Sequence, residues 1–158
     1  MKKQEKTNVM RYLDARGIPY GEHTYDPDQG LAGMEVARQV GIDSGRVFKT
    51  LVTVGARGQN YVFMIPVECE LNLKKAAVCA GEKSIAMIPQ KQLLPLTGYV
   101  HGGCSPIGMK KFFPTFIDES AILYDTICFS GGRIGYQVEM KLADLMKAIE
   151  IKTGDICG

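Results

Sequence analysis

Val-Phe-Lys-Thr-Leu-Val-Thr-Val, residues 47–54, is the most hydrophobic extended run of this chain and indicates a β-strand. Side chains alternate between the two faces of a strand, so Lys49 shares a face with Val47 and Leu51, while the other face is lined by Phe48, Thr50, Val52 and Val54. The run therefore places one lysine among apolar neighbours on a strand with no plainly solvent-facing side.

The segments around this run predict a hairpin and a series of short helices and strands. Residues 55–60 are glycine-rich and polar, and they join the run to a second strand, residues 61–65. Helical spacing of apolar residues, ended by glycine or proline, predicts helices over residues 8–16, 34–40, 73–80, 90–94 and 142–149. Short apolar runs predict further extended segments over residues 20–25, 115–117, 121–124, 126–129 and 136–139.

These elements define an expected fold class. Closely spaced strands in the last third favour antiparallel pairing, and amphipathic helices can cover the sheet. We therefore expect an α+β fold in which a mixed, largely antiparallel, curved sheet is flanked by helices. The length of 158 residues, of which 46% are hydrophobic and 23% charged, fits one domain over residues 1–158 without repeats or linkers.

Charge and hydropathy limit the location and the partners. No segment approaches the roughly 20 apolar residues of a membrane span. The basic start, residues 1–6, lacks the apolar core of a signal peptide, so we expect a cytoplasmic protein without a membrane partner. The net charge of +2 gives little non-specific attraction to nucleic acid, and any such contact should be local.

The familiar metal, cofactor and hydrolase patterns are not found in the sequence. The five cysteines contain no C-x-x-C pair, and His23 and His101 have no metal-like spacing to another ligand. The glycine pair after His101 lacks the context of a nucleotide-binding loop, so we expect no metal and no cofactor. Cys104 is a conceivable thiol nucleophile with His101 as its base, whereas Ser105 and Ser130 lack a nucleophile elbow.

Lys49 and two glycine loops are the candidate functional elements. An ammonium among apolar neighbours either extends to water or finds an anion, because desolvating an unpaired charge is costly. In the loops, residues 102–108 and 130–132, glycines allow main-chain N–H groups to approach a ligand closely. Two converging amides can hold a carbonyl or an oxyanion, so such a site would bind an acyl group without supplying a nucleophile.

Four motifs, in this order and spacing, resemble those of the YbaK family. They are Phe-Lys-Thr-Leu at 48–51, Leu-Asn-Leu-Lys-Lys-Ala-Ala at 71–77, Gly-Gly-Cys-Ser-Pro-Ile-Gly-Met-Lys-Lys at 102–111 and Ser-Gly-Gly-Arg at 130–133. The resemblance covers nearly the whole chain, and residues 105–111 most resemble the branch of Cys-tRNA(Pro) deacylases. The family, which includes the editing domain inserted in bacterial prolyl-tRNA synthetase, hydrolyses mischarged aminoacyl-tRNA.

The resemblance implies an editing enzyme that uses neither a metal nor a nucleophile of its own. The thiol of the substrate is expected to attack its own ester carbonyl, giving a cyclic thiolactone and free tRNA. Lys49 would pair with the terminal phosphate or ribose, and the backbone of Gly102 and Gly103 would orient the carbonyl. The expected catalytic residues are Lys49, Gly103 and Ser130, and the expected substrate-binding residues are Tyr25, Gly102, Cys104, Ser105, Pro106, Gly131 and Gly132.

Three residues depart from the family pattern. Ile134 stands where many relatives have a basic residue, Gln137 stands near a position that is acidic in some members, and Cys104 occupies a position that is more often aliphatic. The contacts of the loop after Gly132 are therefore left open, and Cys104 can simply fill space as a small hydrophobe.

Two alternatives to Cys-tRNA(Pro) stay open at this point. One is an Ala-tRNA(Pro) or broader aminoacyl-tRNA deacylase that uses an activated water, and the other is a non-catalytic module that binds the acceptor end of tRNA. With so small a net charge, the chain is not expected to select one tRNA unaided. The resemblance points to prolyl-tRNA synthetase as the partner that supplies the identity of tRNA(Pro).

Overall fold

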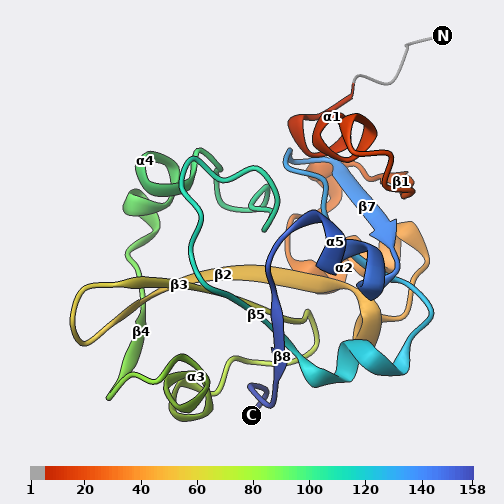
Figure 1. Cartoon of the computed structure of the whole chain (residues 1–158). Coiled ribbons are helices and arrows are strands. Elements are labelled where there is room, and N and C mark those ends of the chain that lie inside the picture. The colour runs from red at the N-terminus through yellow and green to blue at the C-terminus, as the bar shows by residue number, and fades with distance from the viewer. Residues whose placement is uncertain (1–5) are drawn as a thin grey trace, which may run out of the picture.

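The computed structural model describes residues 6–158, in which two β-sheets meet at the start of the long strand β2 (Figure 1). Residues 1–5, most of the basic start of the chain, lie outside the described residues. The helices are α1 (Asn8–Ala15), α2 (Gly33–Val40), α3 (Leu73–Ala80), α4 (Leu93–Thr97) and α5 (Leu142–Ala148). The strands are β1 (Gly21–Thr24), β2 (Phe48–Gly55), β3 (Asn60–Pro66), β4 (Ile85–Met87), β5 (Thr115–Asp118), β6 (Ile127–Ser130), β7 (Tyr136–Met140) and β8 (Lys152–Gly154).

The larger sheet is built on the expected hairpin of β2 and β3. Its strand order is β4-β2-β3-β5-β8; β2 pairs antiparallel with β3 and β4, and β5 pairs parallel with β3 and β8. Phe48 and Val52 enter one hydrophobic core, whereas Leu51 packs with Phe63 in a second core on the other face. The alternation expected for this strand is therefore present.

The smaller sheet has the order β1-β7-β6 and is antiparallel throughout. An isolated parallel bridge between Val47 and Cys128 joins it to the start of β2. The expected α+β class with mixed and antiparallel pairing is confirmed, and the strands divide between two joined sheets.

Helices α1 and α5 close the core on the side of the smaller sheet. Val9 and Leu13 of α1 and Leu145 of α5 are completely buried against Phe129 and Val138 of the sheet. The hydroxyl of Thr7 accepts a hydrogen bond from the Met10 amide and so caps α1. In Figure 1, α1 lies beside β7 at the top of the molecule, while α3 covers the opposite end near β4.

One predicted strand is wrong, and two strands were missed. Residues 121–124 were expected to be extended, but Glu119–Leu123 forms a 3₁₀ helix capped by the Asp118 carboxylate, which accepts a hydrogen bond from the Ser120 amide. Ile122 and Leu123 are largely exposed, so their apolar character does not report burial. The missed strands β4 and β8 are three residues each. None of the described helices has the length and apolar character that crossing a membrane requires.

Candidate active site

A cavity of about 170 Å³ lies where the two sheets meet. The larger sheet contributes Lys49 and Thr50 from β2, and the smaller sheet contributes Ser130 and Gln137 from β6 and β7. The remaining wall is formed by the start of α2 and by the loop before β5 and consists of Leu31, Ala32, Gly33, Val36, His101, Gly102 and Cys104, together with Tyr25, Val47, Phe48, Leu51 and Val67.

The cavity contains one lysine and two buried polar atoms without partners. Lys49 is half-buried and has no ion-pair partner within residues 6–158. The hydroxyl of Thr50 and the side-chain carbonyl oxygen of Gln137 are buried and accept or donate no hydrogen bond in the described part of the chain. Because a buried polar group without a partner costs free energy, two such atoms in one cavity indicate that a ligand completes them.

The first glycine loop contributes less than the sequence suggested. Gly102, with φ of +88°, and Cys104 line the cavity, but the Gly103 amide donates to the carbonyl of Val100 at 2.9 Å. The Gly103 amide is thus already used within the loop, and holding a substrate carbonyl would require that bond to break.

Ser105 and Pro106 lie behind the cavity wall. The Ser105 side chain is fully buried, and its hydroxyl accepts a hydrogen bond from the Ile107 amide. Pro106 lines a separate cavity with Tyr12 and Phe113. Direct substrate contact by these two residues, as expected from the resemblance, is not supported by their positions; both shape the loop that carries Gly102.

The second glycine loop reaches the cavity only through Ser130. Its hydroxyl oxygen accepts a hydrogen bond from the Gly132 amide at 3.1 Å, which leaves the hydroxyl proton for a ligand. The Gly131 amide donates to the Tyr136 carbonyl, so the two glycines form a turn and do not line the cavity. Tyr25, which is 8% exposed, also lines the cavity, and its contact with a substrate stays a prediction.

The thiol of Cys104 is held in its protonated form. Burial raises the pKa of Cys104 to about 12, because a thiolate would lose its hydration there. His101 also borders the cavity, but it is exposed and makes no hydrogen bond with Cys104 among the described residues. A nucleophile that is neither ionised nor bonded to a base is inactive, so the thiol-nucleophile hypothesis receives no support.

The sequence model of the family described as "Aminoacyl-tRNA editing domain" matches residues 31–148, which include most of the cavity wall. The chain belongs to this family. As an editing domain it is an aminoacyl-tRNA deacylase, and its substrate is tRNA carrying an amino acid, as the sequence led us to expect.

Known proteins resemble this editing domain over most of their length. A protein of Enterococcus faecalis (strain ATCC 700802 / V583), EbsC, proposed to be a Cys-tRNA(Pro)/Cys-tRNA(Cys) deacylase, is 46% identical over 140 residues, which are 88% of this chain and 85% of the relative. The crystal structure of a proposed trans-editing enzyme for prolyl-tRNA synthetase superposes with a TM-score of 0.83 at 24% identity, covering 96% of this chain and 98% of the other. The hypothetical protein APE2540 superposes with a TM-score of 0.86 at 22% identity, covering 95% and 99%. The two structures show the fold.

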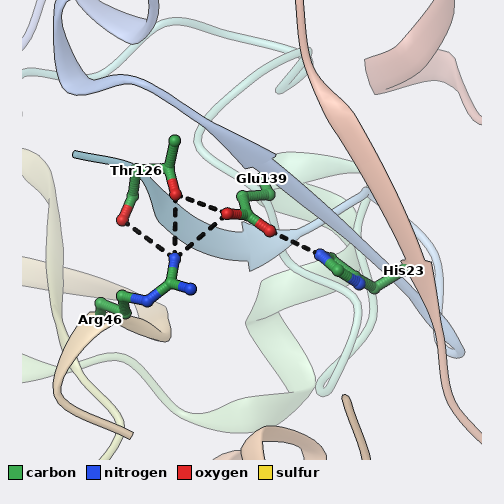
Figure 2. A network of polar contacts seen from close by, with 4 residues as sticks. All are labelled: His23, Arg46, Thr126 and Glu139. Atoms are coloured by element: carbon green, nitrogen blue, oxygen red, sulfur yellow. Dashed lines mark hydrogen bonds and ion pairs between the residues drawn. The ribbon is translucent and has the colours of Figure 1, made fainter. Parts of the chain in front are cut away.

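A second polar cluster of the editing domain lies in the smaller sheet, and Figure 2 shows two of its members, His23 and Glu139. His23, Cys128 and Glu139 bring a ring nitrogen, a sulfur and a carboxylate oxygen within 4.8 Å of one another, the donor types that zinc prefers. The linear spacing of His23 gave no sign of this grouping, because the three residues meet only through pairing in the smaller sheet. The Glu139 carboxylate is already bonded by His23, Thr126 and Arg46, so it is used by the protein itself.

Two polar residues of the cavity were missed as site residues. Thr50 is an ordinary strand residue by its sequence, and Gln137 was noted only as a departure from the family pattern. Leu31 and Ala32, which precede α2, and Gly33, its first residue, lie between the predicted loop and the predicted helix and were not proposed as site residues. Nothing in their local sequence distinguishes these positions, since the junction of the two sheets is what brings them into the cavity.

Proposed function

We propose that this chain removes cysteine from mischarged Cys-tRNA(Pro) in the cytoplasm, acting as one editing domain over residues 1–158. Membership of the editing family and the 46% identity to EbsC support the reaction and the amino acid. A cavity of about 170 Å³ suits a small aminoacyl group, since a cavity of roughly 150 Å³ accommodates benzene. The bulk of the tRNA would then remain outside, with only the ester end entering.

The observation that carries this proposal is a cavity rich in binding groups and poor in nucleophiles. Lys49, Thr50 and Gln137 offer a charge and two unpaired polar atoms, while the Cys104 thiol stays protonated. An enzyme of this kind accelerates a reaction by holding the reacting groups in place, and effective molarities for such positioning are large. A substrate that brings its own nucleophile fits the site best.

The proposed step is an intramolecular acyl transfer. The sulfur of the cysteinyl group attacks the carbonyl carbon of its own ester, a carbon–sulfur bond forms, and the bond from that carbon to the ribose oxygen breaks. The thiol proton passes to the departing ribose oxygen, so the products are a cyclic thiolactone and tRNA with a free terminal hydroxyl. No metal, oxidant or external base enters this balance.

The residues take roles that follow from their chemistry. The Lys49 ammonium pairs with the terminal phosphate or the ribose of the acceptor end, where negative charge develops. The side-chain carbonyl of Gln137 and the Thr50 hydroxyl accept hydrogen bonds from the ammonium group of the amino acid. Ser130 and Tyr25 shape the aminoacyl pocket, and the Gly102 backbone approaches the ester carbonyl.

Parallel deacylation of Cys-tRNA(Pro) and Ala-tRNA(Pro) by wild type and Lys49→Ala tests the proposal. We expect loss of cysteine alone, a thiolactone as the first product, and a rate about 100-fold lower in Lys49→Ala. Lys49→Met is the matched variant, because it keeps most of the apolar stem and removes only the charge. Wild-type rates in either variant would show that Lys49 has no part in the reaction.

The same assay separates the alternatives. Faster loss of alanine, with the free amino acid as product, would assign the chain to a water-dependent deacylase. Binding of both aminoacyl-tRNAs without turnover would leave a non-catalytic module that holds the acceptor end. Either result contradicts thiol-assisted editing, while the fold and the cavity would stand.

We further propose that prolyl-tRNA synthetase is the partner that supplies tRNA identity. The net charge of +2 supports this, because a protein that neutralises few phosphates cannot gain selectivity from contacts along the tRNA backbone. Sedimentation of the chain with the synthetase should show a complex that forms only when tRNA(Pro) is present. Absence of association under these conditions would contradict the proposed partner without affecting the deacylase assay.

A further inference from the structure

A polar network connects four segments of the chain at the junction of the two sheets (Figure 2). The two carboxylate oxygens of Glu139 on β7 meet His23 on β1, at 2.7 Å, and Arg46 just before β2, at 3.2 Å. Thr126, which precedes β6, donates to the same carboxylate and accepts from Arg46 at 2.9 Å. The side chains of Arg46 and Glu139 are about one quarter exposed, so the pair is shielded from most of the solvent.

The network lies one step along the same sheet face from the cavity. Residues two apart on a strand share a face, and Gln137 of the cavity is two residues before Glu139. Tyr25 of the cavity follows β1 directly, two residues after His23 of the network.

Backbone pairing alone holds the two walls of the cavity weakly. Lys49 and Thr50 belong to the larger sheet, Ser130 and Gln137 to the smaller one, and among residues 6–158 a single bridge, Val47 to Cys128, joins the strands that carry them. Arg46 is the residue before this bridge. Its contacts with Glu139 and Thr126 therefore reinforce the junction on the strand that carries Lys49.

The positive charge of Arg46 faces the negative charge of Glu139, so the network should be sensitive to the loss of either residue. Hydrogen bonds from Thr126 and His23, together with the Arg46 guanidinium, lower the pKa of Glu139 to about 2, so the carboxylate is ionised at neutral pH. Removing one member of such a pair leaves the other charged and partly desolvated.

We propose that Glu139 is a positioning residue of the editing reaction: through Arg46 it fixes the wall that carries Lys49 against the wall that carries Gln137. The expected effect on the deacylation rate rests on the proposed function, whereas the expected effect on the junction of the two sheets rests on its geometry alone. Misplacement of reacting groups by about 1 Å costs up to 100-fold in rate, so small relaxation at the junction has a measurable effect.

The kinetic test is Glu139→Gln, which keeps the size of the side chain and removes its charge. We expect kcat for Cys-tRNA(Pro) about tenfold lower with KM changed less than twofold, because the tRNA contacts outside the cavity persist. In an Arg46→Met background, Glu139→Gln should lower kcat less than twofold, since Glu139 acts through Arg46. Fully multiplied effects would overturn the proposal.

The matched control is Glu82→Gln at the opposite end of β2. Glu82 also pairs with an arginine, Arg57, at 2.8 Å, and no residue of this pair lines the cavity. It should leave kcat within twofold of wild type. Equal losses in the two variants would mean that Glu139 contributes only to general stability.

Hydrogen exchange tests the junction without any deacylase assay. In Glu139→Gln, backbone amides of residues 47–49 and 128–130 should exchange about tenfold faster, while those of residues 53–55 keep the wild-type rate. Arg46→Met, which removes the partner, should reproduce this pattern if Glu139→Gln proves poorly folded. Unchanged exchange at the junction would overturn the positioning role, whereas absence of turnover in wild type would overturn only the proposed function.

Discussion

The two ends of β2 differ in whether the buried hydroxyl of a threonine has a hydrogen-bond partner. At the cavity end, Phe48–Leu51, the Thr50 hydroxyl is buried without a partner. At the hairpin end, Val52–Gly55, the Thr53 hydroxyl is fully buried and donates to the Tyr61 carbonyl at 2.9 Å. One strand thus completes its polar groups at the end that is only structural and leaves them open at the end that faces the cavity. Among the described residues, the buried unpaired atoms of Thr50 and Gln137 line the cavity, whereas those of Glu82 and Ser120 do not, so an unpaired polar atom marks the site only where it also lines a cavity.

The cavity and the hairpin end of β2 also differ in how closely their glycines are packed. Substituting these glycines should give the largest difference in stability and in deacylation rate. A Cβ added to Gly33, at the start of α2, would lie 2.7 Å from the Cβ of buried Val67 and closer still to its Cγ1. A Cβ added to Gly55 would meet only the side chain of Glu82. We expect Gly33→Ala to lower the free energy of unfolding by about 2 kcal/mol and to reduce deacylation at least tenfold, because the cavity wall must move.

Gly55→Ala is the counterpart at the hairpin end. The added Cβ would displace the enclosed carboxylate end of Glu82, which pairs with Arg57 outside the cavity. We expect a smaller loss of stability than in Gly33→Ala, because the end of a side chain moves more easily than the Cβ of a packed valine, and an unchanged deacylation rate. Urea unfolding and single-turnover deacylation measure both quantities. Equal destabilisation by the two substitutions would remove the contrast between the ends.

The two threonines give a sharper comparison, because the same substitution is made on the same strand. Thr50→Val should reduce deacylation about tenfold and leave stability unchanged or slightly higher, since it removes a buried hydroxyl that has no partner. Thr53→Val should cost about 1 kcal/mol of stability through its lost hydrogen bond and leave the rate unchanged. Thermal unfolding together with single-turnover deacylation distinguishes the two variants. A lower deacylation rate in Thr53→Val but not in Thr50→Val would contradict the assignment of the Phe48–Leu51 end of β2 to the active site.

The comparison also shows what the sequence could and could not predict. The hairpin of β2 and β3 and the choice of Lys49 as a site candidate were predictable, because alternation and a lysine in an apolar run are local signals. Thr50 and Thr53 look alike in the sequence, and only strand pairing decides which hydroxyl finds a carbonyl. The proposed role of Gln137 could not be predicted from the sequence for the same reason.

Errors in the fold have equally physical causes. The 3₁₀ helix Glu119–Leu123 was predicted in part as a strand because Ile122 and Leu123 are apolar, yet the Asp118 cap and the burial of Ala121 decide its form. Strands β4 and β8 form at the open edges of β2 and β5, so their existence depends on neighbours and hardly on their own three residues. The glycine loops were found by their motifs, whereas the use of the Gly103 amide inside its loop was not visible there.

Acidification should weaken the cavity end through Glu139. Its pKa is about 2 in the folded protein, below the ordinary 4.5, so its stabilising contribution is complete above about pH 5 and is lost as pH falls toward 2. We expect the stability difference between wild type and Glu139→Gln to be about 1 kcal/mol at pH 6 and to vanish near pH 2. The facing groups His23, Arg46 and Thr126 are present in both proteins, so the difference reports the Glu139 charge together with its contacts to these three groups. A difference that stays constant with pH would mean that ionisation of Glu139 does not matter to the junction.

Cys104→Val should have the smallest effect at the cavity end. The thiol is buried and, with its pKa raised to about 12, remains protonated at neutral pH, so its contribution is the volume that it fills. Valine is apolar and of similar size, and we expect deacylation within twofold of wild type and a change in stability below about 1 kcal/mol. Single-turnover deacylation together with binding of Cys-tRNA(Pro) is the decisive measurement. If Cys104→Val bound Cys-tRNA(Pro) but no longer turned it over, the enzyme would use its own thiol. The cavity end of β2 would then face a buried group that reacts, and not only polar atoms that bind the substrate.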